Sequence, residues 1–532
     1  MKLHRLSSLI LVALAGQAGI AYADNISLRV NFNEGRAGTS FAPIHAQVGT
    51  FALTPDLPGH ANGPHWRVVA KNAQGVILHE VTVKNLQQRH VEVFNPKNGA
   101  IDLAQTVKQA SGAFEVSLPF DANTASVEVL PPKSANVSAR AAAGPLAKFD
   151  RASLEKMANT SKMVRIQAAA ATATTIIETG PSNQRMDYVF VGDGYTAAEM
   201  SKWHADSKKV IDGFMADPLF AANRAKMNVR RVDIASNQSG VDEPDKGIYR
   251  DTAMDGNFYC YNIERLLCVN ETKVYSVVGS VLAPDKRDVI IVISNSTRYG
   301  GSGGAIATLS MHASSTEVAL HEIGHTAFAM ADEYQYGTCD VRTEPTEGNV
   351  SLNKTRSVKW GSMIAASTPV PTSAGSVPNG TVGTFQGGQY CEAGKYRPTE
   401  NSRMRTLGFP WHAVNDKLAQ TVFAKYTPTP GGAVTQTGTL SSGGVAYAPS
   451  ASPGYVLAAA GTISLQLTGP SGADFDLSLY KSSNGAWVKV ASSTGPSSTE
   501  SINYAGTAGY YYVQVKSYSG SGNYTLKYTF PK

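Results

Sequence analysis

The sequence is poor in charge, in cysteine and in long apolar runs, and each shortage excludes a class of protein. Charged residues make up 17% of its 532 residues, and 47 basic side chains nearly balance 41 acidic ones. A concentrated basic face for nucleic acid is therefore not expected. The four cysteines include no C-x-x-C pair, which argues against a zinc site built from thiolates. No apolar run is long enough to cross a bilayer, so we expect no membrane span.

The first residues have the pattern of a secretory signal peptide. Lys2 and Arg5 are basic, an apolar run extends from Leu9 to Leu14, and residues 21–23 read Ala-Tyr-Ala, a small-x-small cleavage site. We therefore predict that residues 1–23 are a signal peptide. The protein is expected to be secreted, to the periplasm or outside the cell.

An even number of cysteines in an exported chain favours disulfides over free thiols. Four cysteines can pair in three ways, and closeness in the sequence favours one of them. Cys260 with Cys268 would close a single loop, and Cys339 with Cys391 would join two later segments.

The remaining chain divides into four segments, and together they predict a multidomain α+β protein. Residues 24–132 alternate apolar and polar positions in short runs, which predicts an antiparallel β-sandwich. We find no metal-ligand spacing and no catalytic constellation there. Residues 133–172 are a predicted linker with one helix, which is either cut to release an activated catalytic domain or is a plain spacer. Residues 173–428 alternate strands with helices, and residues 433–532 form a second predicted β-sandwich, rich in Ser, Gly and Tyr.

Within residues 173–428 the pattern predicts a mixed sheet backed by two helices. The predicted strands cover residues 186–192, 229–235, 289–294 and 305–310, and the first helix covers residues 197–215. Thr196 followed by Glu199 is a capping-box arrangement at the start of that helix. The glycine-rich stretch Gly300–Gly304 lacks the spacing of a phosphate loop. We interpret it as a turn that lets a peptide reach the edge of the following strand.

The second helix carries the pattern H-E-x-x-H. His321 and His325 are four residues apart and so lie on one helix face, where two imidazoles can bind one metal ion. Glu322 lies between them and can take a proton from a water molecule that the metal activates. The neighbouring residues are uncharged, as a helix beside a dry cleft requires. We expect zinc, with His321 and His325 as ligands and Glu322 as the catalytic base.

A catalytic zinc ion needs a third protein ligand, and Asp332 is our choice. A straight helix would place Asp332 about 16 Å from His321 along the axis, so the chain must turn back after about Phe328. In the long metzincin motif a glycine occupies that position and a histidine is the third ligand, one residue earlier than Asp332. Glu333 is the competing ligand. Glu344 and Glu347 are disfavoured because they lie in a stretch without helical pattern.

Three further side chains complete the predicted site. Met404 follows in a polar turn, where it fits the methionine that packs beneath the metal in metzincins, and an ordinary core methionine is the alternative. Tyr334 and Tyr396 are candidates to assist the oxyanion.

The motifs of this region resemble the IgA-peptidase-type zinc metallopeptidases of bacteria. The resemblance covers about residues 182–426 and rests on these segments: Val189–Thr196, Ser239–Asp242, Arg298–Gly304, His321–His325, Ala331–Tyr334, Tyr396–Pro398 and Arg403–Arg405. It implies a zincin fold, zinc on His321 and His325, Glu322 as general base and Asp332 as the family's acidic residue. Residues 24–130 resemble the β-domain that often precedes such peptidases.

Two departures from the family stand near the methionine turn. Ser402 replaces a common cysteine, and the residues from Phe409 to Ala413 replace a cysteine-containing segment, so a family disulfide is missing there. Residues 433–532 resemble the bacterial pre-peptidase C-terminal domain, through Asp474–Leu477 and Gly509–Val515.

The sequence therefore predicts a secreted zinc endopeptidase acting on a protein or peptide substrate. One alternative is a non-catalytic adhesin or glycan-binding protein derived from a zincin, and another is an aminopeptidase. The tyrosines of the C-terminal segment offer contact with a polymer or glycan, although strand-core tyrosines are the commoner explanation.

Overall fold

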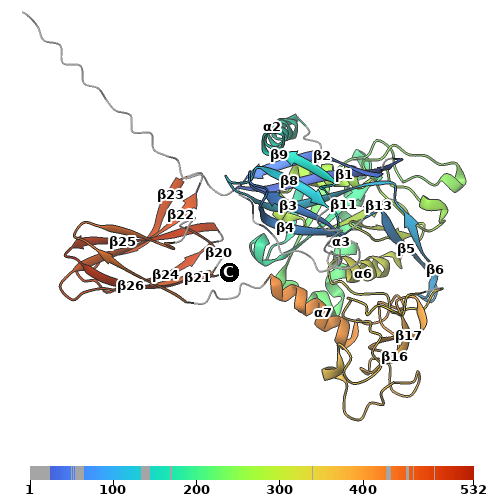
Figure 1. Ribbon diagram of the computed structural model, residues 1–532. Helices are drawn as coiled ribbons and strands as arrows, with labels where there is room; N and C mark the ends of the chain where they lie inside the picture. Colours follow the sequence, from blue (N-terminus) through green and yellow to red (C-terminus); the bar gives the residue numbers. More distant parts are fainter. Residues whose placement is uncertain are drawn as a thin grey trace, which may run out of the picture.

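The computed structural model describes residues 24–531, apart from 37, 50, 52, 54–64, 85, 133–143, 168–170, 338, 427–432, 451–454, 459–460, 484–485 and 508. The predicted signal peptide lies outside the described residues. Among those residues, no helix combines the length and the apolar character needed to cross a membrane. Most regular structure is β, in several sheets (Figure 1).

The middle of the chain forms a six-stranded mixed sheet in the order β10-β12-β11-β13-β15-β14. Its strands are β10 (Thr172–Ile177), β11 (Met186–Asp193), β12 (Met227–Asp233), β13 (Val289–Ser294), β14 (Gly301–Ser302) and β15 (Ala307–Ser310). The four inner strands run parallel, and β10 and β14 pair antiparallel at the two edges. Every residue of β11 and β13 is buried, as expected for parallel strands covered on both faces.

Helices cover both faces of this sheet. Tyr188 and Phe190 of β11 face a core shared with α3 (Met200–Ala216) and α6 (Ser315–Thr326), while Val189 and Val191 face α5 (Glu271–Val281). The predicted pair of helices is therefore found on one face, and the predicted capping box of Thr196 and Glu199 is present. Two more helices, α4 (Pro218–Ala222) and α7 (His412–Lys425), complete the first core.

The glycine-rich stretch before β15 differs from its prediction. Gly301 and Ser302 form β14, which pairs antiparallel with Leu309 and Thr308 and so covers the edge of β15. Glycine lets the chain double back on itself within a few residues. The outer side of β14 is in turn bridged to Leu266, and the Leu267 N–H donates to the Gly301 carbonyl, so our prediction of an open edge at β15 was wrong.

The N-terminal residues form two sheets around their own core. One has the order β2-β1-β7 and the other β4-β3-β8-β9. Their strands are β1 (Asp24–Gly35), β2 (Gly38–Gly49), β3 (His65–Lys71), β4 (Ile77–Lys84), β7 (Ser111–Phe120), β8 (Ser126–Leu130) and β9 (Ala147–Asp150). Trp66 lies at the centre, in ring contact with Phe32, Phe41 and Phe114.

This N-terminal unit extends past the predicted boundary at residue 132. Strand β9 and helix α2 (Arg151–Gln167) bury Phe149 and Leu154 in its core, so most described residues of the predicted linker are part of the unit. Two strands leave the sandwich as a separate hairpin, β5 (Gln88–Phe94) paired with β6 (Ile101–Lys108). Figure 1 shows this hairpin beside α6, the helix with the H-E-x-x-H pattern.

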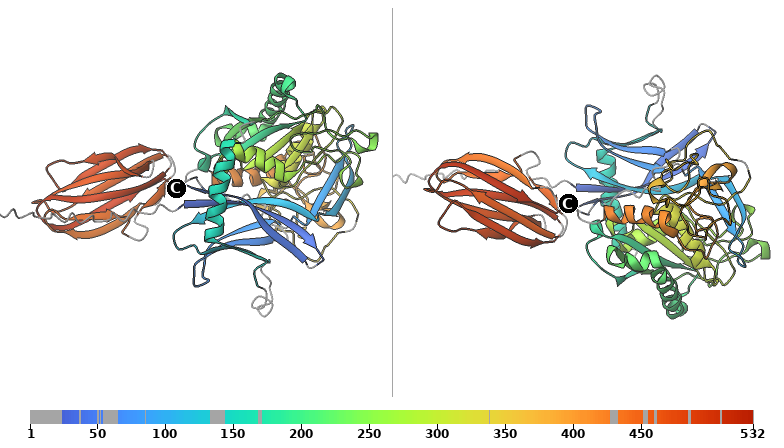
Figure 2. Two further views of the ribbon diagram at one scale, coloured as in Figure 1. Left: turned by 90° about the horizontal axis from the view of Figure 1, so that it is seen from above. Right: turned by 90° about the horizontal axis from the view of Figure 1, so that it is seen from below.

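The C-terminal unit is a second sandwich, as predicted. One sheet has the order β18-β26-β21-β24 and the other β19-β25-β22-β23, with β20 also paired to β25. Their strands are β18 (Val434–Leu440), β19 (Val445–Ala448), β20 (Val456–Ala458), β21 (Gly461–Thr468), β22 (Asp474–Ser483), β23 (Ala486–Ser493), β24 (Glu500–Gly506), β25 (Gly509–Ser519) and β26 (Gly522–Thr529). Figure 2 shows this unit set apart from the rest of the molecule.

Both predicted disulfides are present. Cys260 pairs with Cys268, and Cys339 pairs with Cys391, the first residue of β17 (Cys391–Arg397). Strand β17 pairs with β16 (Phe385–Gly388), and the second disulfide ties this hairpin to the segment that follows α6.

Candidate metal centre

Helix α6 presents two imidazoles in the form that binds metals. His321 Nδ1 lies 2.9 Å from the carbonyl oxygen of Arg403, and His325 Nδ1 lies 2.7 Å from that of Met330. A carbonyl oxygen can only accept, so each Nδ1 carries a proton, and each Nε2 is the nitrogen that faces the centre of the cluster. Such backbone contacts fix the ring orientation of metal-ligating histidines.

The chain turns back directly after α6, and the turn brings Asp332 to the same place. Ala329 has a φ of 52°, and its N–H donates to the carbonyl of His325 over 3.2 Å. This is a left-handed helix end of the kind usually made by glycine, and an alanine there costs about 1–2 kcal/mol. Phe328, just before this turn, keeps its side chain buried in the core. The predicted turn after about Phe328 is confirmed.

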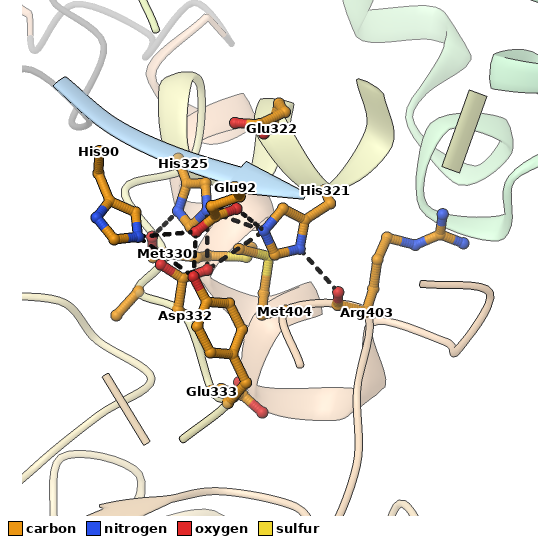
Figure 3. A network of polar contacts seen from close by, with 12 residues as sticks. His90, Glu92, His321, Glu322, His325, Met330, Asp332, Glu333, Arg403 and Met404 are labelled. Atoms are coloured by element: carbon orange, nitrogen blue, oxygen red, sulfur yellow. Dashed lines mark hydrogen bonds and ion pairs between the residues drawn. The ribbon is translucent and has the colours of Figure 1, made fainter. Parts of the chain in front are cut away.

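Three donor atoms from these segments form a nearly equilateral triangle (Figure 3). His321 Nε2 and His325 Nε2 are 3.1 Å apart, and Asp332 Oδ1 lies 3.3 Å and 3.2 Å from them. Tetrahedral zinc with ligands at about 2.0–2.1 Å has ligand atoms about 3.3 Å apart. Asp332 Oδ1 is buried without a hydrogen-bond donor, while its Oδ2 accepts from the Tyr390 hydroxyl over 2.8 Å. Atoms this close require positive charge between them, carried by protons on the imidazoles or by a metal ion, and their spacing fits a zinc ion.

The pKa shifts within the cluster also indicate a site for a cation. Burial alone would lower the pKa of His325, but the Asp332 carboxylate outweighs it and raises the pKa to about 9. For Asp332, burial opposes ionisation, yet the two imidazoles hold its pKa well below the usual range. By themselves these residues therefore stabilise positive charge at the centre of the triangle.

Glu333, the competing ligand, points elsewhere. Its carboxylate accepts from Asn349 over 3.0 Å, from Asn415 over 2.9 Å and from the Ser402 hydroxyl over 2.7 Å. Burial raises its pKa, and these three donors oppose that change. Glu333 thus braces the turn that carries Met404, while Asp332 joins the two histidines.

Glu322 lies beside the triangle, apart from the contacts drawn in Figure 3. Burial, together with the charge of Glu92, raises its pKa to about 7. It lines a cavity of about 410 Å³ with His325 and Asp332. Gly303 makes room for it, because a Cβ at that position would lie 1.7 Å from Glu322 Oε2.

Met404 packs directly under α6, as predicted. It is fully buried, and a Cβ on Gly324 would come within 2.5 Å of its sulfur, so glycine at 324 permits the approach. Of the two tyrosines proposed for the oxyanion, Tyr334 reaches the cluster, where its hydroxyl donates to Glu92. Tyr396 lies in β17, with its backbone paired to Ser351.

The comparisons with known proteins place two domains in the chain. Residues 174–376 match the IgA Peptidase M64 family, and residues 456–517 match the bacterial pre-peptidase C-terminal domain. The M64 match contains His321, Glu322, His325 and Asp332, and it ends before Met404.

Solved structures give only slight similarities. The Yersinia pseudotuberculosis-derived mitogen is 18% identical over 19% of this chain and 86% of its own, with a TM-score of 0.16. The pre-peptidase C-terminal domain of collagenase from Bacillus anthracis is 23% identical over 18% of this chain and 87% of its own, with a TM-score of 0.15. Neither similarity supports a conclusion about this chain.

The sequence interpretation missed one member of the cluster. Glu92, from β5 of the N-terminal unit, places Oε2 3.0 Å from His321 Nε2, and its ligand atom lies within 4.8 Å of those of the other three residues. The prediction that residues 24–132 contain no catalytic constellation is therefore wrong at Glu92. Glu92 lies 229 residues before His321 and outside the M64 match. The sequence signal for Glu92 was its position two residues after His90, which places both side chains on one face of β5.

Proposed function

We propose that the protein is an exported zinc-dependent endopeptidase with a zincin-type catalytic domain. The observation that carries this proposal is the triangle of His321 Nε2, His325 Nε2 and Asp332 Oδ1, with Glu322 on the same helix. The M64 match supports a peptidase, and the two disulfides and the pre-peptidase C-terminal domain are typical of extracellular proteins.

Each residue has a defined task in this mechanism. His321, His325 and Asp332 would hold the ion, and Tyr390 fixes Asp332 through its hydrogen bond of 2.8 Å. When bound, zinc supplies Lewis acidity, which activates water and polarises a carbonyl. Glu322 takes the proton of the attacking water and later gives it to the leaving amine. A carboxylate with a pKa near 7 can both accept and return a proton near neutral pH.

Tyr334 is the candidate donor to the oxyanion. Burial and the carboxylates of Asp332 and Glu92 raise its pKa well above the usual value, so the hydroxyl keeps its proton. A hydroxyl held in a buried site is suited to stabilise developing negative charge.

The test uses the whole secreted chain and measures zinc content together with casein cleavage. We expect one tightly held zinc ion per chain and cleavage that a chelator abolishes. Glu322→Gln should keep the ion and lose about 10²–10⁴-fold in rate. Glu344→Gln, an acidic residue further along the chain, should match the parent. A chain that holds no zinc, or a Glu322→Gln variant as active as the parent, would contradict the proposal.

Peptide ends distinguish the endopeptidase from the aminopeptidase alternative. An endopeptidase cleaves internally in peptides with blocked amino termini, whereas an aminopeptidase requires the free amine. We expect equal rates on blocked and free forms of one peptide, and cleavage of only the free form would favour the aminopeptidase.

The C-terminal unit supports a second proposal, contact with an extracellular polymer. Tyr480 stacks on Tyr512 at 4.7 Å, Trp487 meets Tyr512 edge-on at 4.7 Å, and the neighbouring Tyr447 is 51% exposed. Aromatic rings near a surface provide apolar area with polar tips, which suits a sugar or a polymer chain. Trp487→Ala should reduce co-sedimentation with insoluble polysaccharide while zinc content stays unchanged, and unaltered sedimentation would contradict this proposal.

A further inference from the structure

The fourth position around the candidate zinc site is filled by a residue from outside the M64 domain. Glu92 Oε2 lies 3.0 Å from His321 Nε2 and 4.0 Å from His325 Nε2, and the residue is 7% exposed. A catalytic zinc site has three protein ligands and leaves its fourth position to water or substrate, whereas a site with four protein ligands is closed.

Glu92 faces the site with one oxygen and is held by the other. Its Oε1 accepts from the Tyr334 hydroxyl and lies 3.4 Å from His90 Nε2. Its Oε2 faces His321 Nε2, whose ring already donates from Nδ1 to the Arg403 carbonyl. At 3.0 Å the two atoms share either the proton of an imidazolium or a metal ion, and the triangle with Asp332 Oδ1 fits the metal ion.

We propose that Glu92 is a fourth zinc ligand and that the β5–β6 hairpin holds the peptidase in a latent form. This inference rests on the proposed function. In this form Glu92 takes the coordination position that the attacking water needs. Displacement of the hairpin opens the site.

The same hairpin also covers the edge where an extended substrate would pair. Arg89 of β5 donates to the Ser302 hydroxyl over 3.2 Å and to the carbonyl of Gly303, next to the edge strand β14. Its other terminal nitrogen lies 3.6 Å from Glu271. A peptide added to the sheet needs free backbone groups at this edge. The hairpin therefore blocks the metal position, and Arg89 together with Leu267 occupies the backbone carbonyls of the neighbouring edge.

Apolar contacts hold the hairpin in place on both sides of Glu92. Phe94 packs 4.8 Å from the His321 ring, in a cluster with Tyr299, Val318 and Leu407. Val91 and Val93 pack on Ile263 and Leu266. Release of Glu92 consequently requires movement of the whole strand.

Polar contacts fasten the far end of the hairpin. Arg265 donates to the Phe94 carbonyl over 3.0 Å and pairs with Asp102 over 2.7 Å. The N–H of Leu407, beyond the methionine turn, donates to the Gly99 carbonyl over 2.9 Å. The hairpin is thus attached to segments on both sides of the candidate centre.

The experiment compares the parent with Glu92→Gln in the full chain, with Glu34→Gln as the matched control. Glu34 belongs to the same unit and pairs with Lys108 at the other end of the hairpin. Gln keeps the size and the acceptor for Tyr334 but is a poor zinc ligand. We expect Glu92→Gln to release zinc to a chelator at least about tenfold faster and to cleave casein at least about tenfold faster. Its cobalt-substituted form should show a changed visible absorption spectrum, and Glu34→Gln should match the parent in all three.

A second variant tests the covered edge without touching the centre. Arg89→Ala removes charged hydrogen bonds that hold the hairpin, so we expect casein cleavage to rise several-fold. The cobalt spectrum should stay unchanged. It keeps the inference testable if Glu92→Gln folds poorly.

The outcomes separate this inference from the proposed function. If the parent holds zinc and Glu92→Gln changes neither zinc release nor the cobalt spectrum, Glu92 is not a ligand and the inference fails while the peptidase stands. If Glu92→Gln holds zinc but loses cleavage, Glu92 acts on the substrate and latency is overturned. If no variant binds zinc, the proposed function itself fails.

Discussion

The two β-sandwiches at the ends of the chain relate to the peptidase domain in opposite ways. The N-terminal unit is docked through a buried ion cluster in which Glu115 of β7 lies 3.1 Å from Arg29 and 2.7 Å from Arg287. It also sends the β5–β6 hairpin across the candidate centre. The C-terminal unit has its own core and is set apart in both views (Figures 1 and 2). The two sandwiches thus differ in their surfaces. The N-terminal unit buries charged groups against the peptidase domain, and the C-terminal unit has a core of its own.

The largest expected effect comes from the core of each sandwich. Trp66→Ala and Phe475→Ala each remove a buried ring and should cost about 3–5 kcal/mol. If only the N-terminal unit is docked, Trp66→Ala should also speed zinc release, whereas Phe475→Ala should not. Calorimetry and chelator exchange measure both quantities. Equal effects of the two variants on zinc release would break the comparison.

A smaller effect is expected from the ion cluster at the docking surface. Glu115→Gln leaves two buried guanidinium groups without their carboxylate and should destabilise the chain by about 3 kcal/mol, the low end for such a pair. The low end applies because Arg29 also donates to the Tyr275 carbonyl over 2.6 Å and to Ser276 over 3.2 Å. The surface pair of Glu155 and Arg151 is the control, and Glu155→Gln should cost roughly 0–1 kcal/mol.

The same cluster predicts a dependence on acid. Burial alone would raise the pKa of Glu115, but Arg287 and Arg29 outweigh it and lower the pKa below its usual value. A carboxyl group with a lowered folded pKa stabilises the structure above its unfolded pKa of about 4.3. That stability is lost as the pH falls through the folded pKa. Hydrogen exchange of the docked unit should therefore rise below about pH 4. A Glu115→Gln variant should not show this rise in hydrogen exchange at low pH. If the variant still shows the rise, groups other than Glu115 cause it.

The smallest effect should follow removal of the C-terminal unit. A chain that ends at Tyr426 should keep its zinc, its unfolding temperature in the peptidase transition and its casein cleavage rate within about a factor of two. Independent units without shared contacts behave additively. A large loss of zinc or of peptidase stability would show that the C-terminal unit is docked after all.

The sequence allowed prediction of features set by local periodicity. Alternation located strands in all three units, and the spacing of four placed His321 and His325 on one helix face. Strand β2 contains Pro43, which is tolerated because β2 lies at the edge of its sheet. The strand content of the predicted linker was missed because β9 is stabilised by a core contributed from residues far earlier.

The metal centre shows the limit of such reasoning more sharply. The choice between Asp332 and Glu333 depends on the left-handed turn at Ala329, and alanine gives no signal for such a turn. Glu92 could not be found by spacing, because the docking of one unit on another brings it to the histidines. Long-range contacts of this kind follow from tertiary packing, which local patterns do not encode.

The most direct measurement is a crystal structure of the full chain grown with zinc, with anomalous scattering recorded at the zinc edge. Our account predicts one ion that contacts His321 Nε2, His325 Nε2, Asp332 Oδ1 and Glu92 Oε2. An ion held by the first three residues with water in the fourth position, and Glu92 turned away from it, would contradict the latent form. An ion bound elsewhere, with none at this cluster, would contradict the metal centre itself.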